Sequence, residues 1–322
     1  MRQFAKPTIV VSKCLEFDAC RYNGEMIPDV TIRNLQPFVT FIPVCPEVEI
    51  GLGTPRETIR IVEKNGENRL VQPSTREDVT EKMEQFSNDF LQTISDVDGF
   101  ILKNRSPSCG TRDVKIYSGF EKAPAKGKGS GLFGGAVVKK FSHLPIEEEG
   151  RLSNFIIREH FFTRLFTIAY YKMIKHNKNM KDLVSFQSDN KYLFMAYNQV
   201  KQKELGRIIA NHKNEKIEVV FENYEKTLYE LFMRTPRYTS NVNVCEHIFG
   251  YFKTKLKKQE KDHFIELLQK YAEKKIPLSS LLTILKSWAI RFDEKYLLRQ
   301  TYFEPYPEAL VEISDSGKGR DY

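Results

Sequence analysis

Three cysteines of this chain, Cys14, Cys45 and Cys109, each follow a short run of apolar residues. The spacing leaves 30 residues between the first two and 63 between the last two, which matches no zinc finger or ribbon, because those sites group their ligands in close pairs. It also lacks the tight cysteine triplet of bacterial ferredoxins. Three thiolates suit a cubane iron–sulfur cluster with one iron left open, and an open metal position is where substrate binds. The spacing is equally compatible with three buried cysteines that act as small apolar residues.

The apolar runs before these cysteines have the pattern of buried parallel strands. They cover residues 7–12, 39–44 and 98–102, are rich in β-branched and aromatic residues, and end in turn-forming residues. Residues 77–94 carry apolar side chains at helical spacing, and an alternation of strand, helix and strand favours a parallel sheet. Because ligands of open α/β sheets bind beyond the carboxyl ends of the strands, we expect the three thiols to converge there.

Two later segments bear on how the first half of the chain ends. Residues 125–131 are rich in glycine and precede a helical pattern over 132–141, so their backbone N–H groups could approach a bound anion or the cluster; a flexible turn is the alternative. Residues 143–150 combine Pro145 with three consecutive glutamates. This composition predicts an exposed hinge between two domains.

The pattern of apolar residues changes at this hinge from alternating strands and helices to helices alone. We therefore expect an α/β domain over residues 1–145, an all-α domain over 151–313 and a flexible tail over 314–322. Within the second domain, apolar periodicity predicts helices from residue 152 onward and over residues 184–212, 219–233, 244–273 and 278–289.

The charge of the chain is concentrated in its second half. Residues 1–150 carry 20 Lys and Arg against 21 Asp and Glu, a net −1, whereas residues 151–322 carry 30 against 21, a net +9. A one-sided basic balance is typical of a protein that binds a polyanion, above all nucleic acid, and a merely solvated basic surface is the alternative. No stretch reaches the roughly 18 apolar residues of a membrane span. The odd number of cysteines and the lack of an export signal argue for a reducing, cytoplasmic location.

The sequence around the three cysteines resembles the thiouracil desulfidase family. The resemblance rests on three motifs in order along residues 8–140, which are VSKCL at 11–15 with RYNG at 21–24, PVCPEV at 43–48 with GLGTPR at 51–56, and LKNRSPSCG at 102–110. The helical half is similar to the companion domain of two-domain members, which are desulfidases of 4-thiouridine in tRNA. The resemblance thus implies an RNA-modifying enzyme, and the net +9 of the helical half favours a macromolecular substrate over a free base.

The resemblance also implies a cofactor and a reaction. In this family three cysteines hold a [4Fe-4S] cluster, and by motif position those ligands are Cys14, Cys45 and Cys109. The unique iron accepts sulfur from the thiocarbonyl, a soft donor that suits a soft acceptor. Thiouridine and water give uridine and hydrogen sulfide. The carbon keeps its oxidation level, so no redox partner is needed.

Proton transfer requires polar residues near the cluster. Glu47, two residues after Cys45, is the best placed carboxylate for activating water or protonating the base, although a helix-start or salt-bridged carboxylate is the alternative. Ser106 and Ser108 precede Cys109 and could orient the substrate or donate to the cluster; turn and N-cap chemistry explains such serines almost as well. We prefer Ser108 because it adjoins a ligand. Cys20 is expected to be a small packing residue.

Basic residues in both halves are candidates for contacts with RNA phosphates, while most nearby aromatic residues have the spacing of core residues. Those in the first half could instead neutralise the negative charge of the cluster. The candidates are Lys103, Arg105, Arg112, Arg158, Arg164, Lys172, Arg234, Arg237, Lys255, Lys257 and Lys258.

Two other functions remain compatible with these residues. One is a desulfidase of free thiouracil or thiouridine. The other is a nucleic-acid-binding protein whose cluster senses iron or redox state and performs no catalysis. Sulfide release separates a sensor from an enzyme, and a salt-dependent affinity for tRNA separates the two kinds of enzyme.

Overall fold

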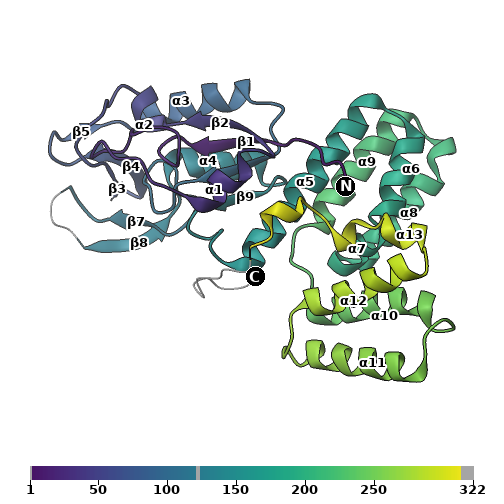
Figure 1. Ribbon diagram of the computed structural model, residues 1–322. Coiled ribbons are helices and arrows are strands. Elements are labelled where there is room, and N and C mark those ends of the chain that lie inside the picture. Colours follow the sequence, from purple (N-terminus) through teal and green to yellow (C-terminus); the bar gives the residue numbers. More distant parts are fainter. Residues whose placement is uncertain (1, 121–123, 313–322) are drawn as a thin grey trace. The chain divides into compact units, whose positions relative to one another are not determined.

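The computed structural model describes residues 2–120 and 124–312, which form two compact units (Figure 1). The first unit runs to Ala169 and includes the chain again from Ala309, and the second is Tyr170–Glu308. The division lies inside helix α5 (Phe155–Asn177), later than the hinge predicted at residues 143–150. The first turns of α5 belong to the first unit because their apolar side chains pack there, as Phe166 does against Phe4. The tail predicted over 314–322 lies outside the described residues.

A four-stranded parallel sheet forms the centre of the first unit, as predicted. Its strand order is β2 (Thr40–Val44), β1 (Thr8–Ser12), β6 (Gly99–Leu102) and β9 (Ile146–Glu148). All three neighbouring pairs are parallel. The central strands β1 and β6 are buried along almost their whole length, and their apolar side chains, at Ile9, Val10, Val11, Phe100, Ile101 and Leu102, are fully buried, which is why their sequences read as apolar runs.

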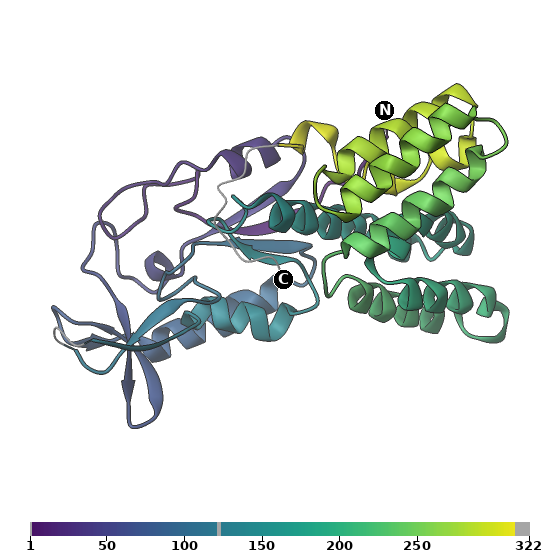
Figure 2. The same cartoon turned by 90° about the horizontal axis from the view of Figure 1, so that it is seen from below.

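Helices cover both faces of this sheet. Helices α3 (Thr80–Thr93) and α4 (Leu132–Phe141) lie side by side on one face, and the short helix α1 (Val30–Leu35) lies on the other (Figure 2). Phe141 of α4 packs on Phe100 of the sheet, with ring centroids 5.0 Å apart. The helix predicted over 132–141 is confirmed, and the one predicted over 77–94 begins later because residues 77–78 form a strand.

A second sheet of five strands was not predicted from the sequence. Its order is β5 (Glu77–Asp78), β4 (Glu67–Gln72), β3 (Arg60–Lys64), β7 (Val114–Tyr117) and β8 (Ala125–Gly129). Strand β8 is the glycine-rich segment for which an anion-binding loop or flexible turn was expected. That expectation is wrong because the backbone of these residues pairs antiparallel with β7.

The expected exposed hinge at residues 143–150 is also wrong. Its residues 146–148 form edge strand β9 of the parallel sheet. The side chains of Glu147, Glu148 and Glu149 are buried, with 4%, 3% and 9% exposure. Buried carboxylates need charged or hydrogen-bonding partners, and each of the three has them. A run of glutamates therefore belongs to the core of the first unit rather than to a linker.

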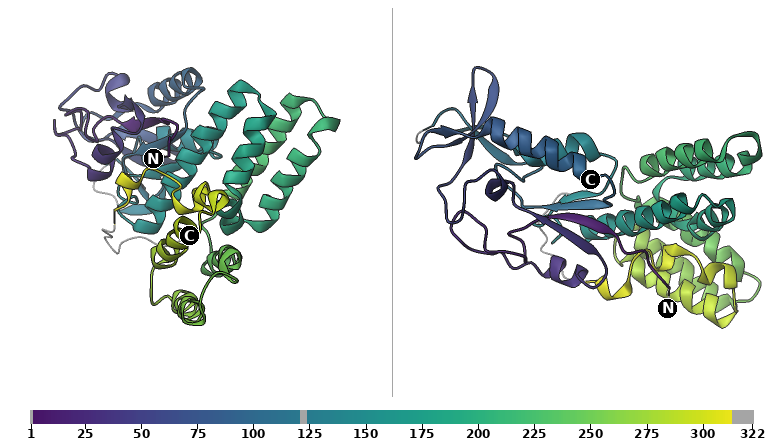
Figure 3. Two further views of the ribbon diagram at one scale, coloured as in Figure 1. Left: turned by 45° about the vertical axis from the view of Figure 1, so that its right-hand side comes forward. Right: turned by 90° about the horizontal axis from the view of Figure 1, so that it is seen from above.

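The second unit is helical, as predicted. Its helices are α6 (Met180–Asp189), α7 (Lys191–Tyr197), α8 (Gln199–Ala210), α9 (Ile217–Leu231), α10 (Tyr238–Phe249), α11 (Lys258–Ala272), α12 (Leu278–Arg291) and α13 (Lys295–Leu298). Within this unit α8 packs beside α9, and α10 beside α11 (Figure 3). In the described part of the chain, no helix is both long and apolar enough to cross a membrane.

Two of the long helices predicted in this unit are divided into shorter ones. The segment 184–212 breaks at Asn190, between α6 and α7, and again at Asn198, whose side chain accepts hydrogen bonds from the amides of Val200 and Lys201 and so begins α8. The segment 244–273 breaks after Phe249, and Glu260 begins α11 by accepting a hydrogen bond from the Lys257 amide. Capping side chains thus set where these helices begin, although the apolar periodicity of the sequence continues across each break.

Candidate active site

Three neighbouring strands of the parallel sheet deliver one cysteine each to a single cavity. Cys14 follows β1 by two residues, Cys45 comes directly after β2, and Cys109 lies in the loop after β6. Because β2, β1 and β6 are adjacent and parallel, their carboxyl ends meet at one edge of the sheet. All three thiols are free and line a cavity of about 350 Å³. The structure thus brings together the three residues that the sequence singled out.

The cavity disfavours negative charge on Cys14 and Cys109. Burial and the neighbouring Cys45 raise the pKa of Cys14 to about 12, against the opposing effect of the Lys103 ammonium. Burial also raises the pKa of Cys109, and a hydrogen bond from Ser12 partly offsets this effect. Thiolates are required for metal binding, so three of them here need a cationic group among them.

Three thiols are a donor set that suits an iron–sulfur cluster. Among the described residues, no group of three or more His, Cys, Asp or Glu side chains is arranged to hold one metal ion. A cubane takes each thiolate on a different iron, so its ligands are spread around the cofactor. Cys14, Cys45 and Cys109 are the residues that could hold it, since each is a soft donor, each follows a different strand and all three line one cavity.

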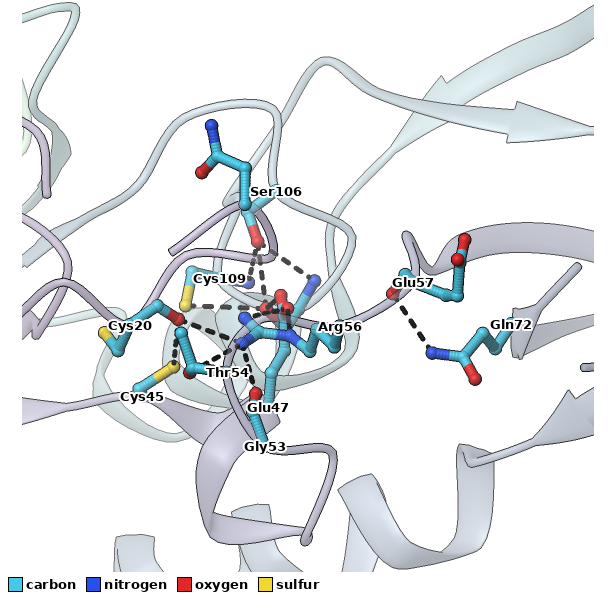
Figure 4. A network of polar contacts seen from close by, with 12 residues as sticks. Cys20, Cys45, Glu47, Gly53, Thr54, Arg56, Glu57, Gln72, Ser106 and Cys109 are labelled. Carbon is cyan, nitrogen blue, oxygen red and sulfur yellow. Dashed lines mark hydrogen bonds and ion pairs between the residues drawn. The ribbon is translucent and has the colours of Figure 1, made fainter. Parts of the chain in front are cut away.

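Glu47 is held beside the cysteines by an arginine. The carboxylate lies in the first turn of the short helix α2 (Pro46–Glu49), directly after Cys45. Arg56 donates from Nε at 2.8 Å and from Nη2 at 2.5 Å to the same oxygen, Oε2 (Figure 4). Its Nη1 donates to the carbonyl oxygens of Cys20 and Gly53 at 2.9 and 2.8 Å. Both side chains are largely buried, at 13% exposure for Glu47 and 4% for Arg56. The guanidinium therefore fixes the orientation of the carboxylate and leaves Oε1 for another partner.

That partner is Ser108. Its hydroxyl donates to Glu47 Oε1 at 2.6 Å and lies 3.7 Å from Cys109 Sγ. Ser106 has a different position, since its Oγ accepts hydrogen bonds from the amides of Ser108 and Cys109 at 3.3 and 3.1 Å. The two hydroxyls are 2.9 Å apart. Ser106 thus shapes the turn, whereas Ser108 connects the carboxylate to Cys109.

The buried glutamates around β9 hold both ends of the Cys109 loop. Glu148 Oε1 accepts hydrogen bonds from Thr111 N at 2.7 Å, Thr111 Oγ1 at 3.0 Å and Arg112 N at 3.2 Å. Glu149 accepts from the Asn104 amide at 2.7 Å and pairs with the ammonium of Lys103. The position of Cys109 therefore depends on carboxylates from a strand about 40 residues further along the chain.

The predicted basic residues of the first half differ in their surroundings. Lys103 is half-buried between Glu149 and Asn104, and Arg112 lies 3.9 Å from Glu147. Arg105 is exposed and forms no ion pair with any other described residue. Of these three predicted contacts, Arg105 has the environment that suits a phosphate.

Arg158 does not suit an RNA contact, and the structure contradicts that prediction. The side chain is only 4% exposed, and it donates to the carbonyl oxygens of Leu152 and Glu312 at 2.8 and 2.7 Å. Arg164 is half-buried and donates to the carbonyl of His143 at 3.2 Å, and Lys172 is half-buried. These residues lie on α5, and the face of a helix that is buried cannot be read from charge alone.

The basic residues predicted in the second unit lie on its surface. Arg234 and Arg237 are exposed in the turn between α9 and α10, and Lys257 and Lys258 are exposed at the start of α11. Lys255 is exposed as well but is paired with Glu294.

Three residues of the cavity had no role assigned from the sequence. Arg56 was part of a motif, but only the structure shows that it holds Glu47. Ser12 is buried and accepts a hydrogen bond from the Lys103 amide beside Cys109. Cys20 was expected to be a packing residue, and its side chain instead lines the same cavity as the three cysteines. The signal that could have identified Ser12 is its place at the end of the strand, two residues before Cys14.

Comparisons with known proteins divide the chain into the same two parts. A family model described as 2-thiouracil desulfurase matches residues 9–149, and one described as a protein of unknown function (DUF1722) matches residues 191–307. The uncharacterised protein YbbK of Bacillus subtilis is 36% identical over 118 residues, which is 34% of this chain and 77% of YbbK. The uncharacterised protein YbgA of Escherichia coli is 23% identical over 156 residues, which is 48% of this chain and 92% of YbgA.

Among solved structures, a [4Fe-4S]-dependent thiouracil desulfidase, TudS, is similar to part of this chain. The two are 25% identical, the match covers 46% of this chain and 93% of TudS, and the TM-score is 0.37.

Proposed function

Because this chain belongs to the 2-thiouracil desulfurase family, joined to a DUF1722 domain, we propose that it is an iron–sulfur desulfidase acting on 4-thiouridine in tRNA. The family membership bears out the resemblance drawn from the three cysteine motifs. The proposed reaction replaces the C4=S bond with C4=O. The oxygen comes from water, and both protons of that water leave with the sulfur as hydrogen sulfide.

The observation that carries this proposal is the cavity itself, in which three thiols from three strand ends lie beside one carboxylate and one hydroxyl. A [4Fe-4S] cluster held by Cys14, Cys45 and Cys109 would supply an open iron as a soft acceptor for thiocarbonyl sulfur. No other residue of the cavity has to be a ligand in this proposal, so the polar groups remain available for the substrate and for protons.

Glu47 and Ser108 are the groups that would move the protons. Arg56 binds Oε2 of the carboxylate, so Oε1 points to Ser108 Oγ, and a proton can pass between them along a 2.6 Å hydrogen bond. Ser108 Oγ is also next to the sulfur of Cys109, and therefore at the edge of the place where the substrate sulfur would leave. Glu47 Oε1 would take a proton from the attacking water through Ser108 and return it to the departing sulfur.

The size and charge of the molecule support RNA as the substrate. A cavity of about 350 Å³ is at the small end of ligand sites and admits one base rather than a stacked helix. A thiolated residue within tRNA would therefore be turned out of its stack to enter. The net +9 of residues 151–322, with Arg234, Arg237, Lys257 and Lys258 on the surface, suits a polyanion.

An anaerobic turnover assay tests this function. The protein is reconstituted with iron and sulfide, thiolated tRNA or free 4-thiouridine is added, and the near-ultraviolet absorbance of the thiocarbonyl is followed together with sulfide release. We expect loss of absorbance on tRNA, and no loss with Cys45→Ala. Cys245→Ala is the matched control, because Cys245 is a buried cysteine of the second unit that pairs with Tyr302 at 3.8 Å.

The other outcomes select the alternatives. Turnover of the free nucleoside without turnover of tRNA would make this a desulfidase of small molecules. Turnover of neither, with an intact cluster in the wild-type protein, would contradict the enzymatic proposal and favour a sensor.

A further inference from the structure

A second cavity adjoins the cysteine cavity in the first unit. Its volume is about 520 Å³, and four residues, Thr58, Ile59, Arg105 and Pro107, line both cavities. The loop that carries Cys109 is therefore part of the ridge between them. The remaining walls come from strands β3, β7 and β8 of the second sheet.

The charge of this second cavity is strongly positive. Its walls carry four cations, Arg60, Arg105, Lys115 and Lys128, and one carboxylate, Asp113. Asp113 pairs with Lys128 at 3.0 Å. Lys115 and Arg105 are exposed and have no ion pair within the described residues. A net charge of about +3 on one small cavity attracts an anion with several charges.

Three of the cations stand in a row across the sheet, which we call the basic row (Arg60, Lys115 and Lys128). Lys115 is directly opposite Lys128 in the register of β7 and β8. Ile61 is opposite Ile116, so Arg60, one residue earlier, lies beside Lys115 on the same face. Like charges opposite each other on neighbouring strands destabilise a sheet.

Elsewhere in the same sheet, side chains of opposite charge face each other or form ion pairs. Lys64 is directly opposite Glu67, Arg69 pairs with Asp78 at 2.8 Å, and Glu63 pairs with the ammonium of Lys126. The row of like charges is therefore confined to the part of the sheet that faces the cavity. Asp113 offsets the charge of Lys128 within this row, and a bound anion would offset repulsion that remains.

An aromatic ring completes the second cavity. Tyr117 is half-buried on the same face as Lys115, two residues along β7, and the guanidinium of Arg60 lies 4.8 Å from its ring centroid. A basic groove with an accessible aromatic ring is the combination by which proteins hold single-stranded nucleic acid, through phosphate contacts and base stacking.

We propose that this second cavity is a subsite for the RNA strand next to the thiolated residue, with the basic row on its phosphates and Tyr117 against a neighbouring base. The subsite rests on the proposed function, because it assumes a polynucleotide substrate. It assigns part of the RNA recognition to the first unit, on the far side of the Cys109 loop from the cluster site. The second unit is then not the sole source of affinity for RNA.

A set of substrates of increasing length tests the subsite by activity. The substrates are 4-thiouridine, its 5′-monophosphate, a short single-stranded oligonucleotide with one internal 4-thiouridine, and thiolated tRNA. For Lys115→Ala and Tyr117→Ala we expect kcat/KM to fall about tenfold on the oligonucleotide and on tRNA, and to stay unchanged on the nucleoside and the monophosphate. Lys64→Ala is the matched control, an exposed lysine of the same sheet that faces Glu67.

A binding measurement separates this proposal from the proposed function. Fluorescence anisotropy of an unthiolated, labelled oligonucleotide needs no turnover, and Lys115→Ala should weaken its binding and reduce the slope of log affinity against log salt by about 0.7. Weaker binding in a protein that never releases sulfide would leave the subsite in place and overturn the desulfidase. Unchanged binding and unchanged kcat/KM on the oligonucleotide would overturn the subsite, as would an equal loss on all four substrates. A loss that already appears with the monophosphate would also overturn it, because a single phosphate would then be the ligand.

Discussion

Replacement of Glu148 by alanine should loosen the loop that carries Cys109. The carboxylate is 3% exposed and accepts three hydrogen bonds, two of them from the backbone amides of Thr111 and Arg112. Alanine removes all three. Within the described residues Glu148 makes no hydrogen bond to Glu47 or Ser108, so the change tests how the Cys109 loop is held rather than the proposed proton transfer.

The size of the effect follows from the number and environment of these bonds. A hydrogen bond to a charged acceptor contributes about 1.5–3 kcal/mol to the free energy of unfolding. Thr111 and Arg112 are half-buried, so water satisfies part of what the variant loses, and burial of the carboxylate is no longer a cost. We therefore expect a loss of about 3 kcal/mol, which lowers the Tm of the first unit by roughly 6–12 °C.

The assay must report on the first unit. The single tryptophan, Trp288, lies in the second unit, so its fluorescence follows the wrong transition. Calorimetry resolves unfolding of the two units, and hydrogen exchange of the Thr111 and Arg112 amides reports on the loop directly. Glu148→Gln should lie between wild type and Glu148→Ala, because it keeps an acceptor without the charge. Glu84→Ala, an exposed glutamate of α3, should stay within about 0.5 kcal/mol of wild type.

The reconstituted variant should also hold less iron per chain, because Cys109 is no longer positioned. Unchanged exchange of both amides together with an unchanged Tm would refute the reasoning. It would mean that the loop is held by its own turn and not by β9.

Three further predictions concern single side chains. Ser108→Ala should keep the cluster spectrum and lower kcat by about 10²-fold, whereas Ser106→Ala should act mainly by loosening the turn and reduce iron content; equal kcat losses at full iron content would contradict this division. Burial lowers the pKa of His160 from 6.5 to about 3, so as pH falls the imidazole is protonated in the unfolded chain before it is protonated in the folded one. The free energy of unfolding that His160 contributes above pH 6.5 is therefore lost below that pH, by about 1.4 kcal/mol per pH unit. Urea unfolding at pH 7 and pH 5 should therefore show about 2 kcal/mol less pH dependence for His160→Gln than for wild type, and identical dependence would exclude this histidine. Arg158→Ala should cost about 2–4 kcal/mol by leaving two carbonyl oxygens unpaired yet leave tRNA affinity of the folded protein unchanged; weaker tRNA binding at full folding would restore it as an RNA contact.

The local pattern of the sequence was enough to identify the central sheet and the three cysteines. The strands before Cys14, Cys45 and Cys109 were predicted to within a residue, because continuous β-branched and aromatic runs have few other stable conformations than a buried parallel strand. Their carboxyl ends then had to meet at one edge. The motif around Cys109 likewise pointed to Ser108, because a residue next to one of the three cysteines must lie close to their cavity.

The second sheet and the basic row were beyond the reach of such reasoning. Strands β3, β7 and β8 are short and charged, and their stability comes from pairing between segments about 50 residues apart. A local window contains no information on which strand lies opposite Lys115. The register decides that, and with it the charge of the second cavity.

The glutamates around β9 show the same limit most clearly. Three consecutive carboxylates read as a solvated linker, because a charged side chain is buried only when partners compensate it. For Glu148 and Glu149 those partners are the amides of Thr111 and Asn104 and the side chain of Lys103, all about 40 residues earlier in the chain. Apolar periodicity is a property of neighbouring residues and can be read from the sequence. The burial of a charge depends on groups that only the folded chain brings to it.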